Sequence, residues 1–315
     1  AHFQGEGLDG MAQWMKAQKV DIVHAYNLFS NCWGGISAFL GGIQKFIGGE
    51  HGTIWFSRPP LLWIERAVYH FSKAVVANSE ASRKMLTYRH RLPSEKIAVI
   101  HNGVPFPTEA HAKASLRKSF GLTPKELVIG TIGRLDTPKD LVTLLEAASI
   151  VLGSRDGVRF VIVGDGPLKA YLQQRAVELK ITDKVIFTGW RQDAREILSI
   201  FDIYVSTSVH ESLGNTLIEA SLCKKPITAP RVDGIPEVID NGTTGLLLAP
   251  SKPVTKPPVA AASPLALKVV IDGEVQNPKS ISVQLLARQI EHLLDHPQRR
   301  KILGNAAYDR VRELF

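Results

Sequence analysis

The stretch from residue 126 to residue 248 alternates short runs rich in valine and isoleucine with segments whose apolar residues recur at helical spacing. The runs lie at 126–132, 158–163, 184–188, 203–207, 226–229 and 245–248, and the helical segments at 141–152, 168–179, 195–201 and 216–224. This alternation predicts parallel strands connected by helices that cover both faces of a sheet. The runs lack a polar–apolar alternation, as expected of strands buried on both faces. The sequence is therefore expected to fold as an α/β protein.

A second set of strand-like runs precedes this stretch, at 20–26, 74–79 and 96–100. Between the two sets, a turn-rich segment at 101–105 leads into a polar stretch that is typical of a surface helix. We therefore predict two domains, residues 1–104 and residues 105–315. The first domain supplies few strands for a doubly wound sheet, so it is expected to be incomplete.

Residues 251–282 differ in composition from the rest of the second domain. The segment holds prolines at 253, 257, 258, 264 and 278, and proline disrupts both helices and strands. We predict a mostly irregular insertion with one hairpin, from Leu267 to Val275 across Asp272-Gly273. Two amphipathic helices, at 283–294 and 298–314, are expected to close the chain.

The composition is that of a folded protein, with 44% hydrophobic and 22% charged residues. No apolar run approaches the roughly 18 residues that a membrane-spanning helix needs, and no signal peptide is visible. The two cysteines, Cys32 and Cys223, fit neither a metal-ligand pattern nor a disulfide framework. A cytoplasmic location without a metal site is the expectation.

The net charge of +8 is spread along the chain without blocks of like charge, and residues 1–104 hold 11 Lys and Arg against 7 Asp and Glu. One hypothesis is that the first domain makes a peripheral contact with an anionic membrane surface. A basic protein that contacts no membrane explains the same counts. No nucleic-acid partner is expected, because the basic residues are not interleaved with aromatic residues that could stack on bases.

A G-x-G-x-x-G pattern runs from Gly5 to Gly10, but no strand leads into it. That pattern indicates dinucleotide binding only between a strand and a helix, so a loop or a helix start is the better interpretation.

A stronger signal follows the strand at 126–132, where Gly133 and Arg134 precede Lys139. Ligands of open parallel sheets bind at the carboxyl ends of strands, and two cations beside a glycine turn suit a diphosphate. A solvated loop with two surface cations is the alternative.

The segment 209–220 is the strongest single signal. A strand ends before it, and a helix is expected to open near Gly214 or Asn215, where free backbone N–H groups form an anion site. Glu219 lies four residues after Asn215, on the same helix face, and is placed to accept bonds from ribose hydroxyls. Glu211 precedes the helix. Stabilisation of the helix start by these acidic side chains is the alternative.

Further loops follow the other strands of the second domain, at 164–167, 189–191 and 233–239. Gly166 lies in the first of these loops, and Gly189 with Trp190 lies in the second, where an aromatic ring suits a nucleobase. Packing of Trp190 in the core or at its rim is the alternative. In the first domain, His51 follows an apolar stretch and precedes a glycine. A histidine in such a position either faces a cleft or is structural.

Taken in order, these motifs resemble the group 1, or family four, retaining glycosyltransferases of GT-B type. The matching residues are Asp21-Ile-Val-His24, His51-Gly52, Asn78-Ser-Glu80, Asn102-Gly-Val104, Gly133-Arg-Leu135 with Lys139, Val163-Gly-Asp-Gly166, Thr188-Gly189, Glu211-Ser-Leu-Gly214 with Glu219-Ala220, Pro226, Gly234-Ile-Pro-Glu237 and Gly242 to Leu246. The resemblance covers residues 18–250 and 283–315. It implies two Rossmann-like domains with parallel sheets that face each other across a cleft.

The resemblance also implies a role for each matching residue. Arg134 and Lys139 would hold the donor diphosphate, Glu219 the ribose, and Glu211 the donor sugar. The backbone from Ser212 through Leu213 and Gly214 to Asn215 would contact phosphate or sugar, with Gly133 and Gly166 nearby, and the residues around Gly189 and Trp190 would lie near the base. His51 would be the cleft histidine of the acceptor-side domain.

The implied reaction transfers a sugar from a nucleoside diphosphate to a glycan or lipid-linked acceptor. It retains the anomeric configuration of the sugar and needs no metal. UDP or GDP is the expected nucleotide, and no separate cofactor is implied. Two positions depart from the family pattern, because Ser212 stands where glycine is usual and Tyr26 where histidine is frequent. A sugar-nucleotide epimerase on the same fold and a chain that binds nucleotide sugar without transferring it remain the alternatives.

Overall fold

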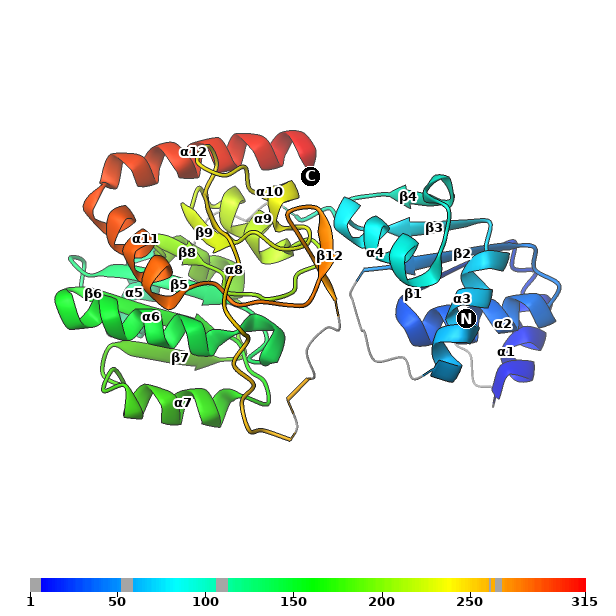
Figure 1. Ribbon diagram of the computed structural model, residues 1–315, viewed down its shortest axis with the longest axis horizontal. Helices are drawn as coiled ribbons and strands as arrows, with labels where there is room; N and C mark the ends of the chain where they lie inside the picture. The colour runs from blue at the N-terminus through cyan, green and yellow to red at the C-terminus, as the bar shows by residue number, and fades with distance from the viewer. Residues whose placement is uncertain (1–6, 52–58, 106–112, 261, 264–267) are drawn as a thin grey trace. The chain divides into compact units, whose positions relative to one another are not determined.

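The computed structural model describes residues 7–51, 59–105, 113–260, 262–263 and 268–315. The chain divides into two compact units, residues 1–101 (unit 1) and residues 102–315 (unit 2), and each is described by itself (Figure 1). Gly5, Gly52 and Leu267, which the sequence analysis singled out, lie outside the described residues.

Unit 1 contains a parallel sheet with the strand order β1-β2-β3-β4. Its elements are, in chain order, α1 (Gly7–Ala17), β1 (Ile22–Tyr26), α2 (Asn27–Leu40), β2 (Lys45–Glu50), α3 (Pro59–Phe71), β3 (Ala74–Ala77), α4 (Glu80–His90), the 3-10 turn η1 (Ser94–Lys96) and β4 (Ile97–Val99). Helix α2 packs against both α1 and α3. Gly7 and Gly10 belong to helix α1, which agrees with the interpretation of this pattern as a helix start.

Strand β2 was not among the strands predicted from sequence. Two glycines, Gly48 and Gly49, weaken the strand signal there, because glycine has low strand propensity. The structure shows why they are present: a Cβ on Gly48 would lie 2.7 Å from the ring of Tyr69, and one on Gly49 would lie 2.6 Å from the ring of Tyr26. Packing of aromatic rings against the strand backbone therefore explains the glycines that hid the strand.

Unit 2 contains a parallel sheet with the strand order β10-β9-β8-β5-β6-β7. Its elements are, in chain order, α5 (Lys113–Ser119), β5 (Leu127–Ile132), η2 (Thr137–Lys139), α6 (Leu141–Ser154), β6 (Val158–Val163), α7 (Lys169–Glu178), β7 (Val185–Gly189), α8 (Ala194–Ile197), η3 (Leu198–Ile200), β8 (Ile203–Val205), α9 (Asn215–Leu222), β9 (Ile227–Pro230), α10 (Ile235–Val238), β10 (Leu246–Leu248), β11 (Val269–Ile271), β12 (Glu274–Gln276), α11 (Val283–Asp295) and α12 (Pro297–Leu314). The strands predicted for this part of the chain are confirmed, with ends shifted by one or two residues.

One large apolar core of unit 2 lies between the sheet and the helices α6, α7 and α11 (Figure 1). It joins Leu144 and Leu145 of α6, Leu172 of α7 and Ile290 of α11 to strand residues such as Phe160. These side chains are almost fully buried, which stabilises the unit by about 1.5–3 kcal/mol for each large apolar side chain. The buried face holds the strands in place and leaves their carboxyl ends free to carry loops.

The direction of the chain across this sheet reverses at β5. From β5 the chain continues to β6 and β7 on one side, and then returns to form β8, β9 and β10 on the other. Neighbouring strands whose connections run in opposite directions leave a crevice at their carboxyl ends, and ligands of open α/β sheets bind there. In unit 2 that switch point lies between β5 and β8.

The segment 251–282 is closed at its base by paired backbone bonds between Lys252 and Ser280. The predicted hairpin is confirmed: β11 and β12 pair antiparallel, and the turn at Asp272 and Gly273 has positive φ angles of 51° and 80°. Over the described residues, no helix combines the length and the apolar character needed to cross a bilayer.

Gly130 in the centre of β5 tests the packing at the switch point. A Cβ there would lie 2.1 Å from the ring of Phe201, which is 1% exposed. We expect Gly130→Ala to lower the free energy of unfolding by about 1–3 kcal/mol, because overpacking forces the ring and strand apart. Gly153→Ala in helix α6, where nothing lies near the added methyl group, is the matched control. It should raise stability by up to ~1 kcal/mol. Urea unfolding measures both, and equal stability of the two variants would contradict the packing argument.

Candidate functional site

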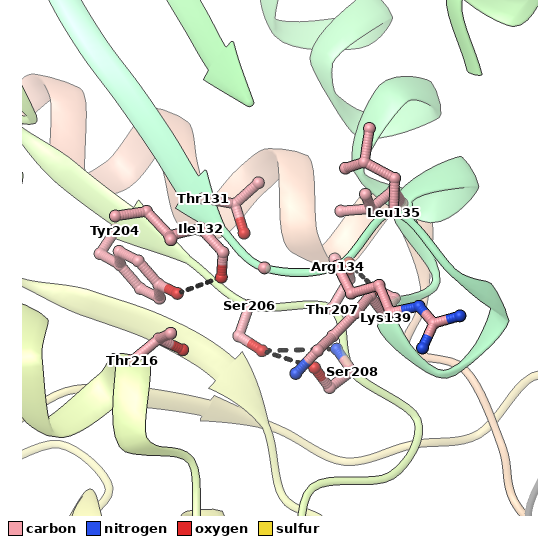
Figure 2. Close-up of a pocket in the computed structure, with 12 residues that line it drawn as sticks. Thr131, Ile132, Arg134, Leu135, Lys139, Tyr204, Ser206, Thr207, Ser208 and Thr216 are labelled. Atoms are coloured by element: carbon pink, nitrogen blue, oxygen red, sulfur yellow. Dashed lines mark hydrogen bonds between the residues drawn. The ribbon is translucent and has the colours of Figure 1, made fainter. Parts of the chain in front are cut away.

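Two loops at the switch point between β5 and β8 line one pocket (Figure 2). The loop after β5 carries Gly133, Arg134 and Lys139, and the segment after β8 carries a Ser-Thr-Ser run. The pocket is lined by Thr131, Ile132, Gly133, Arg134, Leu135, Lys139, Leu141, Tyr204, Ser206, Thr207, Ser208 and Thr216. Cationic side chains, hydroxyl groups and the first turn of a helix therefore meet at the carboxyl ends of adjacent strands.

Glycines allow the loops around this pocket to pack backbone against backbone. A Cβ on Gly164 would lie 1.9 Å from the carbonyl oxygen of Gly133, and one on Gly166 would lie 2.4 Å from that of Leu135. The backbone N–H of Leu135 donates to the carbonyl of Asp165 at 2.9 Å. Gly166, predicted from sequence as a donor-binding residue, thus has a packing role that fixes the loop carrying Arg134.

Lys139 forms an ion pair with Glu211, which joins the loop after β5 to the segment after β8. Figure 2 shows the Lys139 side chain directed toward Ser206 and Ser208, and the Ser208 hydroxyl lies 3.3 Å from the same Glu211 oxygen. Burial opposes ionisation of Glu211. The charge and hydrogen bond of Lys139, with smaller contributions from His210 and Ser208, outweigh burial and leave the pKa of Glu211 below its ordinary value. The carboxylate is thus ionised at neutral pH.

Arg134 is in a different situation from Lys139, although the sequence predicts them as a pair. Its side chain is 66% exposed, and its Nε lies 3.2 Å from the carboxylate of Asp136. Asp136 is buried and also accepts a bond from the backbone N–H of Thr137 at 2.8 Å. One side of the pocket therefore offers a tethered but accessible guanidinium, and the other offers an ammonium already paired with a carboxylate.

Helix α9 begins at Asn215, and Gly214 caps it with a φ of 95° that favours glycine. Leu213 before it is 1% exposed, so that residue can offer a ligand only its backbone. The Asn215 side chain accepts a bond from Asn102 at 3.0 Å. The first N–H groups of a helix have no intrahelical acceptors, which makes this end of α9 favourable for an anion.

Glu219 has a partner that the sequence analysis missed. Its Oε1 accepts a bond from Nε of Arg195 at 2.8 Å, and the Glu219 side chain is 17% exposed. Arg195 lies in helix α8, 24 residues earlier in the chain. No local pattern indicates this pairing, because it depends on how α8 and α9 meet in space.

Gly189 and Trp190 lie at the end of β7, which β6 separates from β5. Trp190 is 74% exposed, so it is not a core residue, and it does not line the pocket of Figure 2. The backbone of Gly189, with a φ of 72°, accepts a bond from Gly164 N–H at 3.0 Å. This connection ties the Trp190 loop to the glycine loop after β6.

His51 belongs to unit 1 and follows strand β2. Its backbone N–H donates to the Asn27 side chain at 3.2 Å, and its carbonyl accepts from the Asn78 side chain at 3.2 Å. The rings of His51 and Tyr26 meet nearly edge to face, with centroids 4.5 Å apart. The Tyr26 hydroxyl in turn lies 3.2 Å from Nδ1 of His24. The structure thus brings His51 together with two further side chains from the end of β1.

Asp233 is a second residue whose role the sequence analysis did not identify. One oxygen of its buried carboxylate lies 2.5 Å from Nδ1 of His210 and accepts the backbone N–H of Glu211 at 3.1 Å. Asp233 is the first residue of the 233–239 loop, whose position after a strand is predicted from the sequence. Its bonds to His210 and to the backbone of Glu211 are not. Within the described residues, no group of three or more His, Cys, Asp or Glu side chains is arranged to hold a metal ion.

The Lys139–Glu211 pair predicts a pH-dependent contribution to stability. Because the native pKa of Glu211 is depressed, the contribution is present above the unfolded pKa of about 4.3 and is lost as the pH falls through the native value. Lys139→Met should lower the free energy of unfolding by about 1–3 kcal/mol at pH 7, with a smaller difference below about pH 4. Urea unfolding at several pH values measures this. Lys169→Met, which breaks a far more exposed pair with Asp165, should cost much less, and a difference independent of pH would refute the assignment.

Two family models match the chain over adjoining regions. Residues 6–106 match the model described as Glycosyltransferase Family 4, and residues 126–258 match the model described as Glycosyl transferases group 1. The alpha-D-kanosaminyltransferase of Streptomyces kanamyceticus is 27% identical over 210 residues, which cover 64% of this chain and 54% of that protein. The N-acetyl-alpha-D-glucosaminyl L-malate synthase of Bacillus anthracis is 28% identical over 250 residues, 75% of this chain and 63% of that protein. The chain spans less than two thirds of the length of both relatives.

A solved structure shares the fold. HepE of Anabaena, crystallised with UDP-glucose, superposes with a TM-score of 0.80 at 21% identity, covering 98% of this chain and 78% of that one. The likeness agrees with the two parallel α/β units described above and identifies the fold as GT-B. With the family matches in both units, the chain belongs to the group 1 and family 4 glycosyltransferases.

Proposed function

We propose that unit 2 binds a nucleoside diphosphate sugar and that the protein transfers the sugar to a glycan or lipid-linked acceptor. The observation that carries the proposal is the pocket at the switch point, where Arg134, Lys139 and the start of α9 converge. An anion placed there meets two cations and the positive end of a helix dipole. The names of the relatives support a transferase, and HepE was crystallised with UDP-glucose.

The diphosphate is proposed to lie between the exposed guanidinium of Arg134 and the ammonium of Lys139. Arginine can bind two phosphate oxygens at once, and lysine adds a point charge. Hydroxyl groups of Ser206, Ser208 and Thr216 line the same pocket and can donate further bonds. Positive charge fixed in place before the reaction stabilises the diphosphate as it leaves the sugar, so we propose that transfer requires no metal.

Glu211 is proposed to face the donor sugar. Its carboxylate already accepts from Lys139 and Ser208, and a carboxylate can accept further bonds from sugar hydroxyls. Lys139 then lies between Glu211 and the adjacent phosphate and attracts both, which reduces the repulsion between the two negative groups. The backbone from Ser212 to Asn215 is proposed to contact phosphate or sugar.

The nucleoside is proposed to bind beside α9, with its ribose hydroxyls on Glu219. Arg195 orients the carboxylate through the 2.8 Å bond from its Nε and leaves the second oxygen available. Gly189 and Trp190 are the candidates for contact with the base, and UDP or GDP is the proposed nucleotide. No cofactor beyond this co-substrate is proposed.

We assign the acceptor side to unit 1, with His51 as its candidate functional residue. We further propose retention of anomeric configuration, which the configuration of the isolated product would decide.

Contact of the basic first unit with an anionic membrane in the cytoplasm stays a hypothesis, and sedimentation with anionic vesicles at low and high salt tests it.

Thermal shift assays with UDP, GDP and ADP, without added metal, test donor binding. A nucleotide present at ~100 times its dissociation constant should stabilise the protein by ~2.7 kcal/mol. Arg134→Ala should remove most of the shift, because it deletes the accessible diphosphate ligand. Arg155→Ala, which breaks an exposed pair with Asp295, should leave it unchanged. The absence of a shift with every nucleotide in folded wild-type protein would refute donor binding.

The role of Glu219 is tested by comparing ribose and 2′,3′-dideoxyribose forms of whichever nucleotide binds. Because a hydrogen bond to a charged group contributes about 1.5–3 kcal/mol, the wild type should prefer the ribose form by roughly tenfold or more. Glu219→Ala should bind the two forms with nearly equal affinity. Calorimetric titration provides the four constants, and a preference that survives in Glu219→Ala would place the ribose elsewhere.

A further inference from the structure

The segment 251–282, here called the insertion, reaches back to the pocket loops although it leaves the sheet after β10. Figure 1 draws its described residues, 251–260, 262–263 and 268–282, in yellow to orange. The group 1 family model ends inside it, at residue 258. Backbone hydrogen bonds between Lys252 and Ser280 bring the two ends of the insertion together.

The first contact of the insertion is with Asp136. The backbone N–H of Ser263 donates to one carboxylate oxygen of Asp136 at 2.7 Å, and the Ser263 hydroxyl donates to the other at 2.5 Å. The same carboxylate lies 3.2 Å from Nε of Arg134 and accepts from Thr137 N–H. Asp136 is 3% exposed, so protein groups rather than water supply its bonds. The insertion therefore completes the surroundings of the group that tethers Arg134.

The second contact is with Asp233, through hairpin strand β11. The backbone N–H of Val270 donates to one Asp233 oxygen at 2.6 Å, and the N–H of Asp233 donates back to the Val270 carbonyl at 2.7 Å. The other Asp233 oxygen holds His210 and the backbone of Glu211. One carboxylate thus joins the hairpin to the segment that carries Glu211.

The two contacts end on the carboxylates that hold Arg134 and Glu211, rather than on the outer surface of the unit. A buried carboxylate that loses one donor is left with an unmet bond, and its remaining partners shift to compensate. We propose that the insertion is a positioning element of the donor site, with Asp136 and Asp233 as the positioning residues through which it acts. This inference rests on the proposed binding of a nucleoside diphosphate.

Two substitutions test the proposal with little disturbance of the fold. Ser263→Ala removes the hydroxyl bond to Asp136 and keeps the backbone bond. Asp233→Asn keeps the size of the side chain and suits the φ of 46°, but an amide has only one acceptor oxygen for the donors around it. Ser263→Thr restores a hydroxyl and is the rescue variant. Thr255→Ala, at an exposed position of the insertion, is the matched control.

Each variant is measured in two ways. Hydrogen exchange of the ligand-free protein reports the protection of residues 134–139 and 209–214 without any reference to binding. Calorimetric titration with UDP and with GDP reports affinity. We expect Ser263→Ala to speed exchange in the first segment and Asp233→Asn in the second. Ser263→Ala and Asp233→Asn should each weaken binding of the nucleotide by about tenfold. The melting temperature of the control and rescue variants should stay at the wild-type value.

The outcomes separate the two proposals. Faster local exchange with weaker binding, both reversed in Ser263→Thr, supports the positioning role. Wild-type affinity and wild-type exchange in both variants overturn it and leave the donor site intact. If wild-type protein binds neither nucleotide, the proposed function fails and the positioning role fails with it, whatever the exchange shows. A fourth outcome is a general loss of hydrogen-exchange protection throughout unit 2, with binding weakened only in proportion to that loss. It would assign the insertion a structural role and also overturn the proposal.

Discussion

The pairing of β5 with β8 is the constraint on which the rest of unit 2 depends. These two strands come from opposite halves of the unit, and their register pairs Ile129 with Ile203 and Gly130 with Tyr204. The close approach requires Gly130, because the ring of Phe201 occupies the space of any larger side chain. Once the pair forms, the loops after both strands meet at the same crevice, and these loops carry Arg134, Lys139 and Glu211.

The charges around that crevice are arranged so that each group already has a partner before a ligand arrives. Lys139 holds Glu211, Arg195 holds Glu219, and Asp136 tethers Arg134. Such pairing fixes side chains in position and avoids the large cost of an uncompensated charge in a partly buried site. A diphosphate would then enter a preorganised site with little rearrangement, which is the condition for strong electrostatic stabilisation of a leaving group.

The agreement between sequence and structure is best where the signal is local. The strands of unit 2 are short runs of mostly apolar residues, and their pattern differs clearly from the periodicity of the helices, so the sequence predicts their positions to within two residues. Strand β2 is not predicted from the sequence because its glycines weaken the strand signal. They are needed to make room for the rings of Tyr69 and Tyr26, which are distant in sequence. The hairpin at Asp272-Gly273 was found because the turn itself demands positive φ angles at those residues.

The α/β class and the order of the elements in unit 2 follow from the amino-acid sequence alone, as does the place of the proposed site residues after strands. These features are local, because they arise from side-chain periodicity and turn chemistry. Which of those residues meet depends on the folded chain. Lys139 pairs with Glu211, and Arg195 bonds to Glu219. Asp136 and Asp233 connect the insertion to the pocket loops. Contacts between residues tens of positions apart depend on strand order and loop packing, and no spacing along the chain encodes them.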